Sequence, residues 1–307
     1  MARAPRPLAG QVVAITGGAR GIGRATASAL IGHGARVAIG DIDAPLAKGT
    51  AAELGAGTIG LALEVTDRPS FEAFLGHVEA QLGPLDVLVN NAGIMPIGPF
   101  VQESDAIADR MIEINLGGVI LGSKLALERF LPRGRGHLVN LASIAGKAGV
   151  AGGATYCATK HAVVGLSEAL RQELHGSGVE VSVVMPIGVN TELYSGLPQP
   201  RGFKTPEPED VAEAIVQAVQ RGRFEVYVPK SIGAVIRSQA LVPRRAAEAV
   251  ARMLGSHEAL TQPDSAARAA YDARLTQTIA GSGSGAETAP GAPAGPSSAQ
   301  EREATVK

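Results

Sequence analysis

The feature that most constrains the fold of this 307-residue chain is a set of seven short apolar runs, rich in β-branched residues. The runs occupy residues 11–15, 36–40, 58–65, 85–89, 136–141, 179–185 and 224–228. Between them lie segments whose apolar residues recur about every 3.6 positions, the period of a helix. Strands that alternate with helices form a parallel sheet with helices on both faces. The sequence therefore predicts an α/β fold with a doubly wound, parallel, seven-stranded sheet.

The composition narrows the functional classes. Hydrophobic residues make up 45% and charged residues 19%, as in ordinary globular proteins. The net charge is −1 and aromatic residues are only 3%, so we expect no nucleic-acid partner. No apolar run approaches the roughly 18 residues of a membrane span, and the histidines show no metal-ligand spacing. The histidine pattern predicts no metal site. The single cysteine, Cys157, and the lack of a signal-peptide pattern predict a cytoplasmic protein.

A glycine-rich turn over residues 16–23 follows the first run and opens a helix expected over 22–33. Backbone N–H groups at a helix N-terminus bind anions, and glycines let a pyrophosphate approach closely. An ordinary βα turn would look similar, but the strand before it and the helix after it favour a dinucleotide site. The candidate cofactor-binding residues here are Gly17, Arg20, Gly21, Ile22 and Gly23.

Asp41 ends the second run, about 20 residues after the glycines, where a carboxylate accepts hydrogen bonds from the adenosine ribose. It would repel a 2′-phosphate, which favours NAD over NADP. Arg20 argues for NADP, because a cation can meet that phosphate. We give Asp41 more weight, since a carboxylate facing a phosphate costs more than an exposed arginine left unpaired. The alternative role for Asp41 is the N-cap of a helix over 45–54.

Other polar or small residues follow the later strands. Glu64 lies at the end of the third run, Asn91, Ala92 and Gly93 follow the fourth, Ser143 follows the fifth and Pro186 follows the sixth. Carboxyl ends of parallel strands meet at one edge of a sheet, so these residues should line one crevice.

Tyr156 and Lys160 are four residues apart in a predicted helix, so they share one face. A nearby ammonium lowers the pKa of a phenol and makes the pair a plausible general acid and base. Alone the pattern is weak, because a half-buried tyrosine often packs on a lysine stem. Asn115, inside a helix expected over 106–130, is either a satisfied core amide or a catalytic one that holds water.

Together these motifs resemble those of the short-chain dehydrogenase/reductase family over residues 11–230. TGGARGIG (16–23) matches the family's cofactor turn, and NNAG (90–93) matches its fourth-strand motif. Asn115, Ser143, Tyr156 and Lys160 match its catalytic tetrad in order and approximate spacing.

The resemblance implies an oxidoreductase on a Rossmann fold that transfers a hydride with NAD, or with NADP as the alternative, and that forms a homodimer or homotetramer. It implies that Tyr156 exchanges a proton with the substrate and that Ser143 holds the substrate oxygen. Lys160, with Tyr156, would bind the nicotinamide ribose and lower the pKa of Tyr156. Asn115 would hold a water that passes protons through Lys160.

Two motifs depart from the family pattern. After the sixth strand the family has Pro-Gly-x-Val-x-Thr, whereas this chain has Pro186, Ile187, Gly188, Val189, Asn190 and Thr191. The family's Asp-Val after the third strand is Glu64-Val65 here, which puts the adenine contact in doubt. From the matching positions, Pro186, Val189, Thr191, Glu64 and Val65 join the expected cofactor site.

A Gly/Pro-rich loop over 187–204 is expected to cover the substrate. Apolar residues near it indicate an apolar substrate: Val150, Ile187, Leu193, Tyr194, Leu197 and residues 94–96. We divide the chain into a disordered arm (1–10), a catalytic domain (11–230), a helical extension (231–280) and a disordered low-complexity tail (281–307). Two amphipathic helices interrupted at Pro243 would pack on the core or on another subunit, or make a peripheral membrane contact.

The leading hypothesis is an NAD-preferring dehydrogenase acting on a lipophilic secondary alcohol or ketone, such as a steroid, retinoid or fatty alcohol. One alternative is an NADP-dependent carbonyl reductase. A second, from another class, is a non-catalytic dinucleotide-binding regulator.

Overall fold

The computed structural model describes residues 5–199, 204–239, 260–261 and 263–282, with isolated residues at 243, 245 and 249. Seven strands form one parallel sheet in the order β3-β2-β1-β4-β5-β6-β7. They are β1 (Val12–Thr16), β2 (Arg36–Asp41), β3 (Ile59–Ala62), β4 (Val87–Asn90), β5 (Gly136–Leu141), β6 (Val179–Pro186) and β7 (Glu225–Val228). The predicted doubly wound, seven-stranded Rossmann sheet is confirmed.

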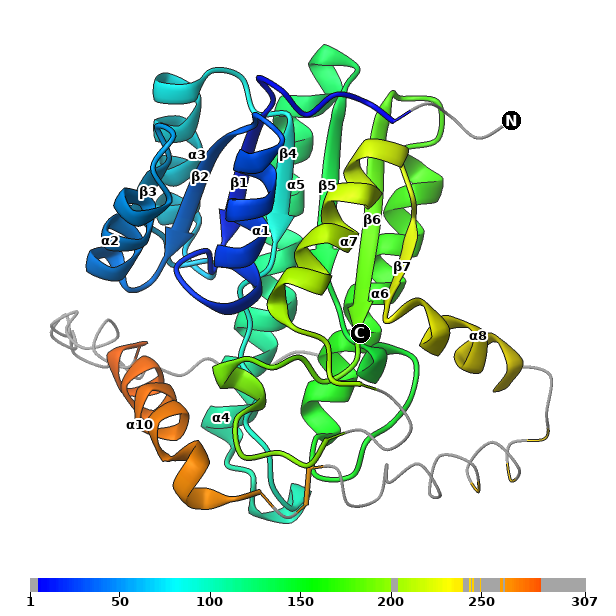
Figure 1. Cartoon of the computed structure of the whole chain (residues 1–307). Coiled ribbons are helices and arrows are strands. Elements are labelled where there is room, and N and C mark those ends of the chain that lie inside the picture. Colours follow the sequence, from blue (N-terminus) through cyan, green and yellow to red (C-terminus); the bar gives the residue numbers. More distant parts are fainter. Residues whose placement is uncertain are drawn as a thin grey trace, which may run out of the picture.

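Helices cover both faces of this sheet (Figure 1). The described α-helices are α1 (Gly21–Gly32), α2 (Ala44–Leu54), α3 (Arg68–Leu82), α4 (Asp105–Ile112), α5 (Gly118–Phe130), α6 (Ala154–Glu173), α7 (Pro208–Arg221), α8 (Lys230–Gln239) and α10 (Ser265–Ser282). Alternate residues of β1 enter opposite cores: Val13 and Ile15 pack with α1 and α7, and Val12 and Ala14 pack with α3 and α5. Burial on both faces explains why the strands are almost continuously apolar.

The sheet order reverses between β1 and β4, and that is where a doubly wound sheet opens a crevice at the carboxyl ends of its strands. Those ends point downward in Figure 1, toward α4, α8 and α10. The fold therefore directs the turns after β1, β2, β4, β5 and β6 to one edge of the molecule.

The long helix expected over 106–130 is interrupted in its middle. A π-helical turn, Glu113–Gly117, separates α4 from α5 and contains Asn115. The Asn115 amide hydrogen-bonds the backbone of Ile94 in both directions, at 2.8 Å each. A single π-turn inserts one extra residue into a helix, and here it accompanies an inward Asn115 side chain.

The disordered arm expected over 1–10 is wrong for residues 5–10, because this segment packs on the domain. Leu8 is 2% exposed and joins the core. The Arg6 backbone N–H and the Arg6 guanidinium each donate to α7 carbonyls, those of Gln220 and Val219, at 2.8 Å. Residues 1–4 lie outside the described part of the chain.

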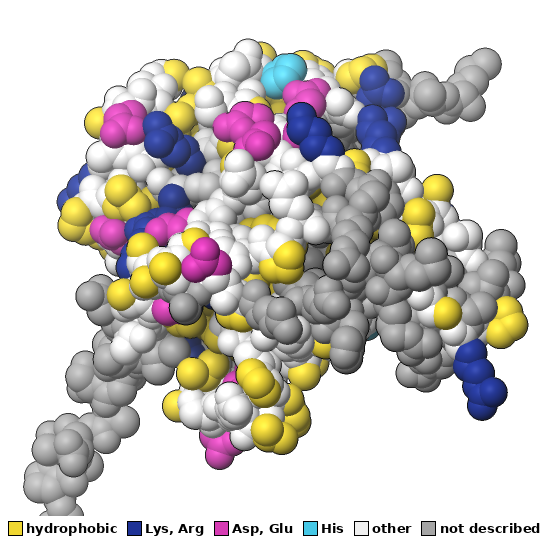
Figure 2. Space-filling view, turned by 60° about the horizontal axis from the view of Figure 1, so that its bottom comes forward, with side chains coloured by type: hydrophobic (Ala, Val, Ile, Leu, Met, Phe, Trp, Pro, Cys, Tyr) yellow, Lys and Arg dark blue, Asp and Glu magenta, His cyan; other side chains and the backbone are white. Residues whose placement is uncertain are grey.

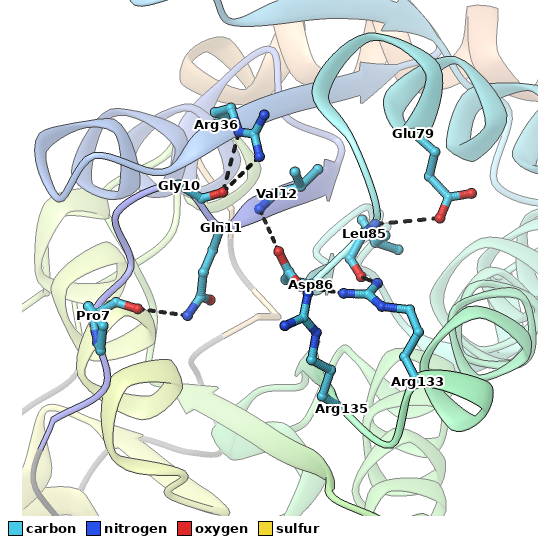
Figure 3. Close-up of polar contacts among 10 residues, drawn as sticks. All are labelled: Pro7, Gly10, Gln11, Val12, Arg36, Glu79, Leu85, Asp86, Arg133 and Arg135. Atoms are coloured by element: carbon cyan, nitrogen blue, oxygen red, sulfur yellow. Dashed lines mark hydrogen bonds and ion pairs between the residues drawn. The ribbon is translucent and has the colours of Figure 1, made fainter.

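Structural polar contacts hold the amino ends of the strands (Figure 3). One Asp86 carboxylate oxygen accepts from the Val12 N–H at 3.1 Å, and the other pairs with Arg133 at 2.6 Å. Arg36 donates to the Gly10 carbonyl at 3.1 Å. The charged residues at this edge are therefore engaged in holding β1, β2 and β4 together.

The C-terminal extension contributes two described helices. α8 packs beside β7, and α10 contacts both α4 and the short helix η5 (Glu192–Tyr194). Of the second amphipathic helix expected after Pro243, the structure describes only isolated residues. The tail expected over 281–307 begins inside α10, which continues to Ser282, and the rest of it lies outside the described residues. The boundaries set at residues 11, 230 and 280 stay predictions. No helix in the described ranges is both long and apolar enough to cross a membrane.

Candidate active site

A cavity of about 900 Å³ lies at the carboxyl edge of the sheet. The structure brings nearly every residue expected in the site to its wall: Gly17, Arg20, Gly21, Ile22, Asp41, Glu64, Val65, Asn91, Ala92, Gly93, Ser143, Tyr156, Lys160, Pro186, Val189 and Thr191. Gly23 and Asn115 do not line it and lie behind the wall. This grouping supports the interpretation of the strand-end motifs as one site.

The glycine turn is shaped for close approach to a ligand. Gly17 and Gly21 have φ values of 62° and 51°, which favour glycine. A Cβ on Gly23 would sit 2.2 Å from the Gly17 carbonyl oxygen. No side chain caps the N-terminus of α1, which begins after Arg20, so its first N–H groups are left for an anion. The turn therefore fits a pyrophosphate.

Asp41 holds this turn from the next strand. Its carboxylate accepts from the backbone N–H groups of Ala19 and Asp43, each at 3.2 Å. Burial raises the pKa of Asp41, while these hydrogen bonds and the nearby Arg20 act to lower it. The alternative role of Asp41 as a helix cap is wrong, since Asp43 caps α2 by accepting from Leu46 N–H at 3.0 Å.

Glu64 lines the cavity with its carboxylate already engaged. One oxygen pairs with Arg110 at 2.7 Å, and the other accepts from the Thr66 hydroxyl at 2.8 Å and the Thr66 N–H at 3.1 Å. The sequence reasoning missed Arg110, which is 5% exposed and also lines the cavity. The only sign of Arg110 in the sequence is a basic residue within the amphipathic helix expected over 106–130.

The turn after β4 is tied to the glycine turn across the switch point. The Thr16 hydroxyl accepts from the N–H groups of Asn91 and Ala92 at 2.9 and 3.0 Å. The Asn91 amide donates to the Thr16 and Gly17 carbonyls, both at 2.9 Å. A Cβ on Gly93 would sit 3.1 Å from the Asn115 amide oxygen, so this position also needs a small residue.

The candidate catalytic residues converge on the inner wall. The Lys160 ammonium donates to the Leu141 carbonyl at 2.9 Å and lies 5.6 Å from the centre of the Tyr156 ring. Ser143 shares a side-chain hydrogen bond with Tyr156. Asn115 is fully buried beside Ile94, one residue beyond Gly93. Tyr156, Ser143 and Lys160 thus face the cavity, with Asn115 behind them.

Burial sets the charge states of this pair. Burial raises the pKa of Tyr156, and the hydrogen bond with Ser143 offsets only part of that rise. Burial also lowers the pKa of Lys160 to about 8. The pKa of Tyr156 thus lies above its usual value, and not below it as the sequence led us to expect, because desolvation of the phenolate is the largest effect. The role of Lys160 in lowering this pKa stays a prediction.

The outer part of the cavity is mostly apolar. Ile94, Val150, Ile187, Leu193 and Tyr194 line it as expected, whereas Leu197 and Pro96 do not. The departure after β6 has a local cause: a Cβ on Gly188 would sit 2.3 Å from the Tyr194 ring, so the glycine is required one place later than usual. Ile187 then contributes its side chain to the wall.

The sequence reasoning missed the contribution of the C-terminal extension to this wall. Residues from α8, α10 and the segment before α10 line the cavity: Ile232, Val235, Ile236, Leu260, Tyr271, Arg274 and Leu275. Arg274 pairs with Glu192, which lies 3.7 Å from Arg20 of the cofactor turn. The available signal was Tyr271, one of only four tyrosines in the chain.

Figure 2 views the molecule with this edge turned forward. Hydrophobic side chains show in part of the centre and over the lower part of this face, and most basic and acidic side chains lie in its upper half. Among the residues the structure describes, no group of three His, Cys, Asp or Glu side chains could hold a metal ion.

A Rossmann sheet with a glycine turn and a Ser-Tyr-Lys set at its carboxyl edge defines a class of dinucleotide-dependent oxidoreductases. The family model described as short chain dehydrogenase matches residues 11–201. The chain therefore belongs to the short-chain dehydrogenase family and is an oxidoreductase, as its motifs predicted.

The chain is similar to several curated dehydrogenases. A 2-(S)-hydroxypropyl-CoM dehydrogenase 3 of Xanthobacter autotrophicus is 40% identical over 228 residues, covering 68% of this chain and 89% of the relative. A sorbitol dehydrogenase of Cereibacter sphaeroides is 38% identical over 191 residues, covering 62% and 75%. A D-threitol dehydrogenase of Mycolicibacterium smegmatis is 37% identical over 221 residues, covering 71% and 81%.

Solved structures have the same fold. A short-chain dehydrogenase/reductase of Burkholderia phymatum in complex with NAD superposes with a TM-score of 0.70 at 27% identity, covering 76% of this chain and 93% of that one. A 3-ketoacyl-(acyl-carrier-protein) reductase of Brucella melitensis complexed with NADH gives a TM-score of 0.68 at 27% identity, covering 72% and 97%.

Proposed function

We propose that this protein is an NAD-preferring dehydrogenase that interconverts a lipophilic secondary alcohol and its ketone, with Tyr156 as the general acid and base. The observation that carries the proposal is the convergence of Ser143, Tyr156 and Lys160 on a cavity that also receives the glycine turn. A regulator that only bound a dinucleotide would need the turn but not these three side chains.

The cofactor end of the cavity fits a nicotinamide dinucleotide. The uncapped N-terminus of α1 and the glycines at 17, 21 and 23 would hold the pyrophosphate. Asp41 would accept the adenosine ribose hydroxyls and repel a 2′-phosphate. Arg20, the residue that favours NADP, pairs with Asp43 at 3.2 Å and faces Glu192, so two carboxylates already balance its charge. NAD and NADH in the two solved relatives support the same choice.

The catalytic roles follow from the geometry. In the reduction direction, the neutral Tyr156 phenol, which burial favours, would give its proton to the substrate carbonyl oxygen while Ser143 orients that oxygen. Alcohol oxidation would reverse this transfer and would need the Tyr156 phenolate as the base. A nicotinamide cofactor, when bound, would supply or accept the hydride. The Lys160 ammonium, which is close to the phenol, stabilises negative charge that develops on Tyr156 and would hold the nicotinamide ribose. Asn115 keeps the π-turn and the Ile94 backbone in place and would hold the water of the proton path.

The apolar wall supports a lipophilic substrate. Hydrophobic side chains from α8, α10 and the loop after β6 enclose the outer cavity, and such a wall favours apolar ligand surface. Two relatives are named for sorbitol and D-threitol, so alcohol chemistry is common to this set. A homodimer or homotetramer and a cytoplasmic location stay predictions from the family resemblance and the composition.

Tyr156→Phe tests the proposed function. The phenylalanine ring keeps the packing but lacks the exchangeable proton, so we expect turnover of secondary alcohols to fall by at least about a hundredfold. NADH binding, followed by fluorescence, should stay within about threefold, and the wild-type protein should bind NADH more tightly than NADPH. Full turnover by the variant would exclude Tyr156 as the acid and base. Tighter NADPH binding would refute the role given to Asp41.

A further inference from the structure

Helix α10 lines the outer side of the cavity, although it lies beyond the part of the sequence that the family model matches. The family model ends at residue 201, whereas α10 spans Ser265–Ser282. Arg268, Tyr271 and Leu275 are spaced by three and four residues, so they share one helix face. Their exposed fractions are 2%, 9% and 9%, so that face is buried against the catalytic part of the chain.

Arg268 fixes α10 over the loop that follows β6. Its guanidinium donates to the carbonyls of Met95, Leu193 and Ser195, at 2.6, 3.2 and 3.4 Å. The same group lies 4.6 Å from the centre of the Tyr271 ring and 3.3 Å from the Asp272 carboxylate. A planar cation bonded to three carbonyls and stacked on a ring holds that ring in one orientation. Arg268 is therefore a positioning residue for Tyr271.

The Tyr271 hydroxyl is held on the cavity wall with its proton free to donate. It accepts a hydrogen bond from the Met95 backbone N–H at 2.7 Å. No acceptor for the phenolic proton occurs among the described residues. Burial raises the pKa of Tyr271 to about 12, so this proton is retained at neutral pH. The hydroxyl can therefore donate one further hydrogen bond, and a ligand in the cavity could accept it.

Tyr271 and Tyr156 lie close together in the cavity. Both line it, and Met95, whose N–H donates to the Tyr271 hydroxyl, belongs to the same buried cluster as Tyr156. Met95, which orients the Tyr271 hydroxyl, follows Ile94, the backbone partner of Asn115. A substrate whose reacting oxygen meets Tyr156 would therefore place a neighbouring group beside Tyr271.

We propose that Tyr271 is a substrate-binding residue that donates a hydrogen bond to a second oxygen of the substrate, near the reacting carbon. The substrate class is then a largely apolar diol or hydroxyketone. This inference rests on the proposed alcohol dehydrogenase function and narrows its substrate. The rest of the wall stays apolar, so the second oxygen supplies orientation within a lipophilic site.

The test uses the full-length protein with NAD⁺ and matched pairs of alcohols, cyclohexanol against 1,2-cyclohexanediol and 2-octanol against 2,3-octanediol. In the wild type, we expect kcat/KM to favour the diols by about 3- to 10-fold, the range for one net hydrogen bond. In Tyr271→Phe, the ratio within each pair should fall to about one. A merely structural role for Tyr271 would lower both members of a pair equally and leave the ratio unchanged, which would overturn the proposal.

Tyr194→Phe is the matched control, because Tyr194 also lines the cavity but its hydroxyl already donates to the Pro198 carbonyl at 2.9 Å. This variant should keep the diol preference. For pairs turned over too slowly, binding to the NADH complex by quenching of its fluorescence gives the same comparison, and equal wild-type affinity for both members counts against the proposal. Tyr156→Phe separates the two claims: it should keep the diol preference in binding and lose turnover, so retained turnover would reject the proposed function alone.

Discussion

At the residue scale, Lys160 and Tyr156 are both buried, and burial disfavours the charged form of each side chain. Both are less than 10% exposed. Burial raises the pKa of Tyr156 and lowers that of Lys160, so the neutral form of each is favoured. The hydrogen bond to the Leu141 carbonyl, at 2.9 Å, holds the Lys160 ammonium in place. Perturbed pKa values in a cavity are common at catalytic sites, because such sites are arranged to stabilise the charge that develops during the reaction.

The burial of Lys160 predicts a pH dependence of stability. Its pKa is about 8 in the folded protein against 10.5 for a free lysine, so the unfolded chain binds more protons between these values. Stability therefore rises with pH through this window. Compared with Lys160→Met, the wild type should gain about 2 kcal/mol of unfolding free energy between pH 8 and pH 10 in urea titrations. If the difference in unfolding free energy between the wild type and Lys160→Met stayed constant or fell with pH, burial of Lys160 would not be costly. Lys48→Met, at an exposed position, controls for the loss of a charge.

Most site residues could be predicted from the sequence because each follows a strand end. Gly17, Asp41, Gly93 and Ser143 are local to a strand whose pattern marks its own end. Tyr271 could not be found this way, since its place depends on Arg268 reaching carbonyls more than 70 residues away in the chain. The raised pKa of Tyr156 could not be predicted either, because a spacing of four residues to Lys160 does not indicate how deeply the phenol is buried.

At the element scale, helix ends and strand ends agreed with the sequence pattern to within a few residues. The predictions for 136–141 and 45–54 match β5 and α2 to within one residue; Pro45 lies in the first turn of α2, and Gly55 follows its last residue. The π-turn around Asn115 was missed, because only the contact with Ile94, from a distant part of the chain, distinguishes it from a continuous helix.

The packing of α5 on β4 predicts a costly substitution. A Cβ on Gly122 would sit 2.4 Å from the Asn90 amide oxygen and 2.7 Å from the Phe71 ring. Both neighbours are buried, so Gly122→Ala should lower the unfolding free energy by about 1–3 kcal/mol. On α2, Gly49 has no atom within 4 Å of the same Cβ position, and Gly49→Ala should be neutral or stabilising by up to about 1 kcal/mol. Equal effects in chemical denaturation would show that helix propensity, and not packing, decides both.

At the scale of the whole molecule, the two edges of the sheet have different tasks. Ion pairs such as Asp86 with Arg133 close the amino edge, while glycine turns and a free helix N-terminus open the carboxyl edge. The N-terminal segment belongs to the closing side, since Arg6 connects α7 with Glu180 of β6. α10 returns from the other end of the chain to cover the open edge.

The junction of the N-terminal segment with β5 and β6 predicts acid sensitivity. His137 is 2% exposed, and burial, followed by the charge of Arg6, lowers its pKa from 6.5 to about 3. The Ser182 hydroxyl donates to the Arg223 carbonyl at 2.6 Å, so it accepts from His137 Nε2 at 2.8 Å, and Nδ1 remains for the Arg6 guanidinium at 3.3 Å. The contact of Nδ1 with Arg6 requires the neutral imidazole, because only an unprotonated Nδ1 can accept a hydrogen bond, although Glu180 lies 3.7 Å from Nδ1.

The unfolded chain therefore binds more protons than the folded protein between pH 6.5 and pH 3, and the stability that the neutral His137 contributes is lost as pH falls through this window. Between pH 6.5 and pH 5, the wild type should lose up to about 2 kcal/mol of unfolding free energy more than His137→Gln, which cannot be protonated. The same exchange at exposed His33 provides the control for loss of an imidazole. Parallel pH profiles for the wild type and His137→Gln, measured by urea unfolding, would place the acid sensitivity elsewhere in the molecule.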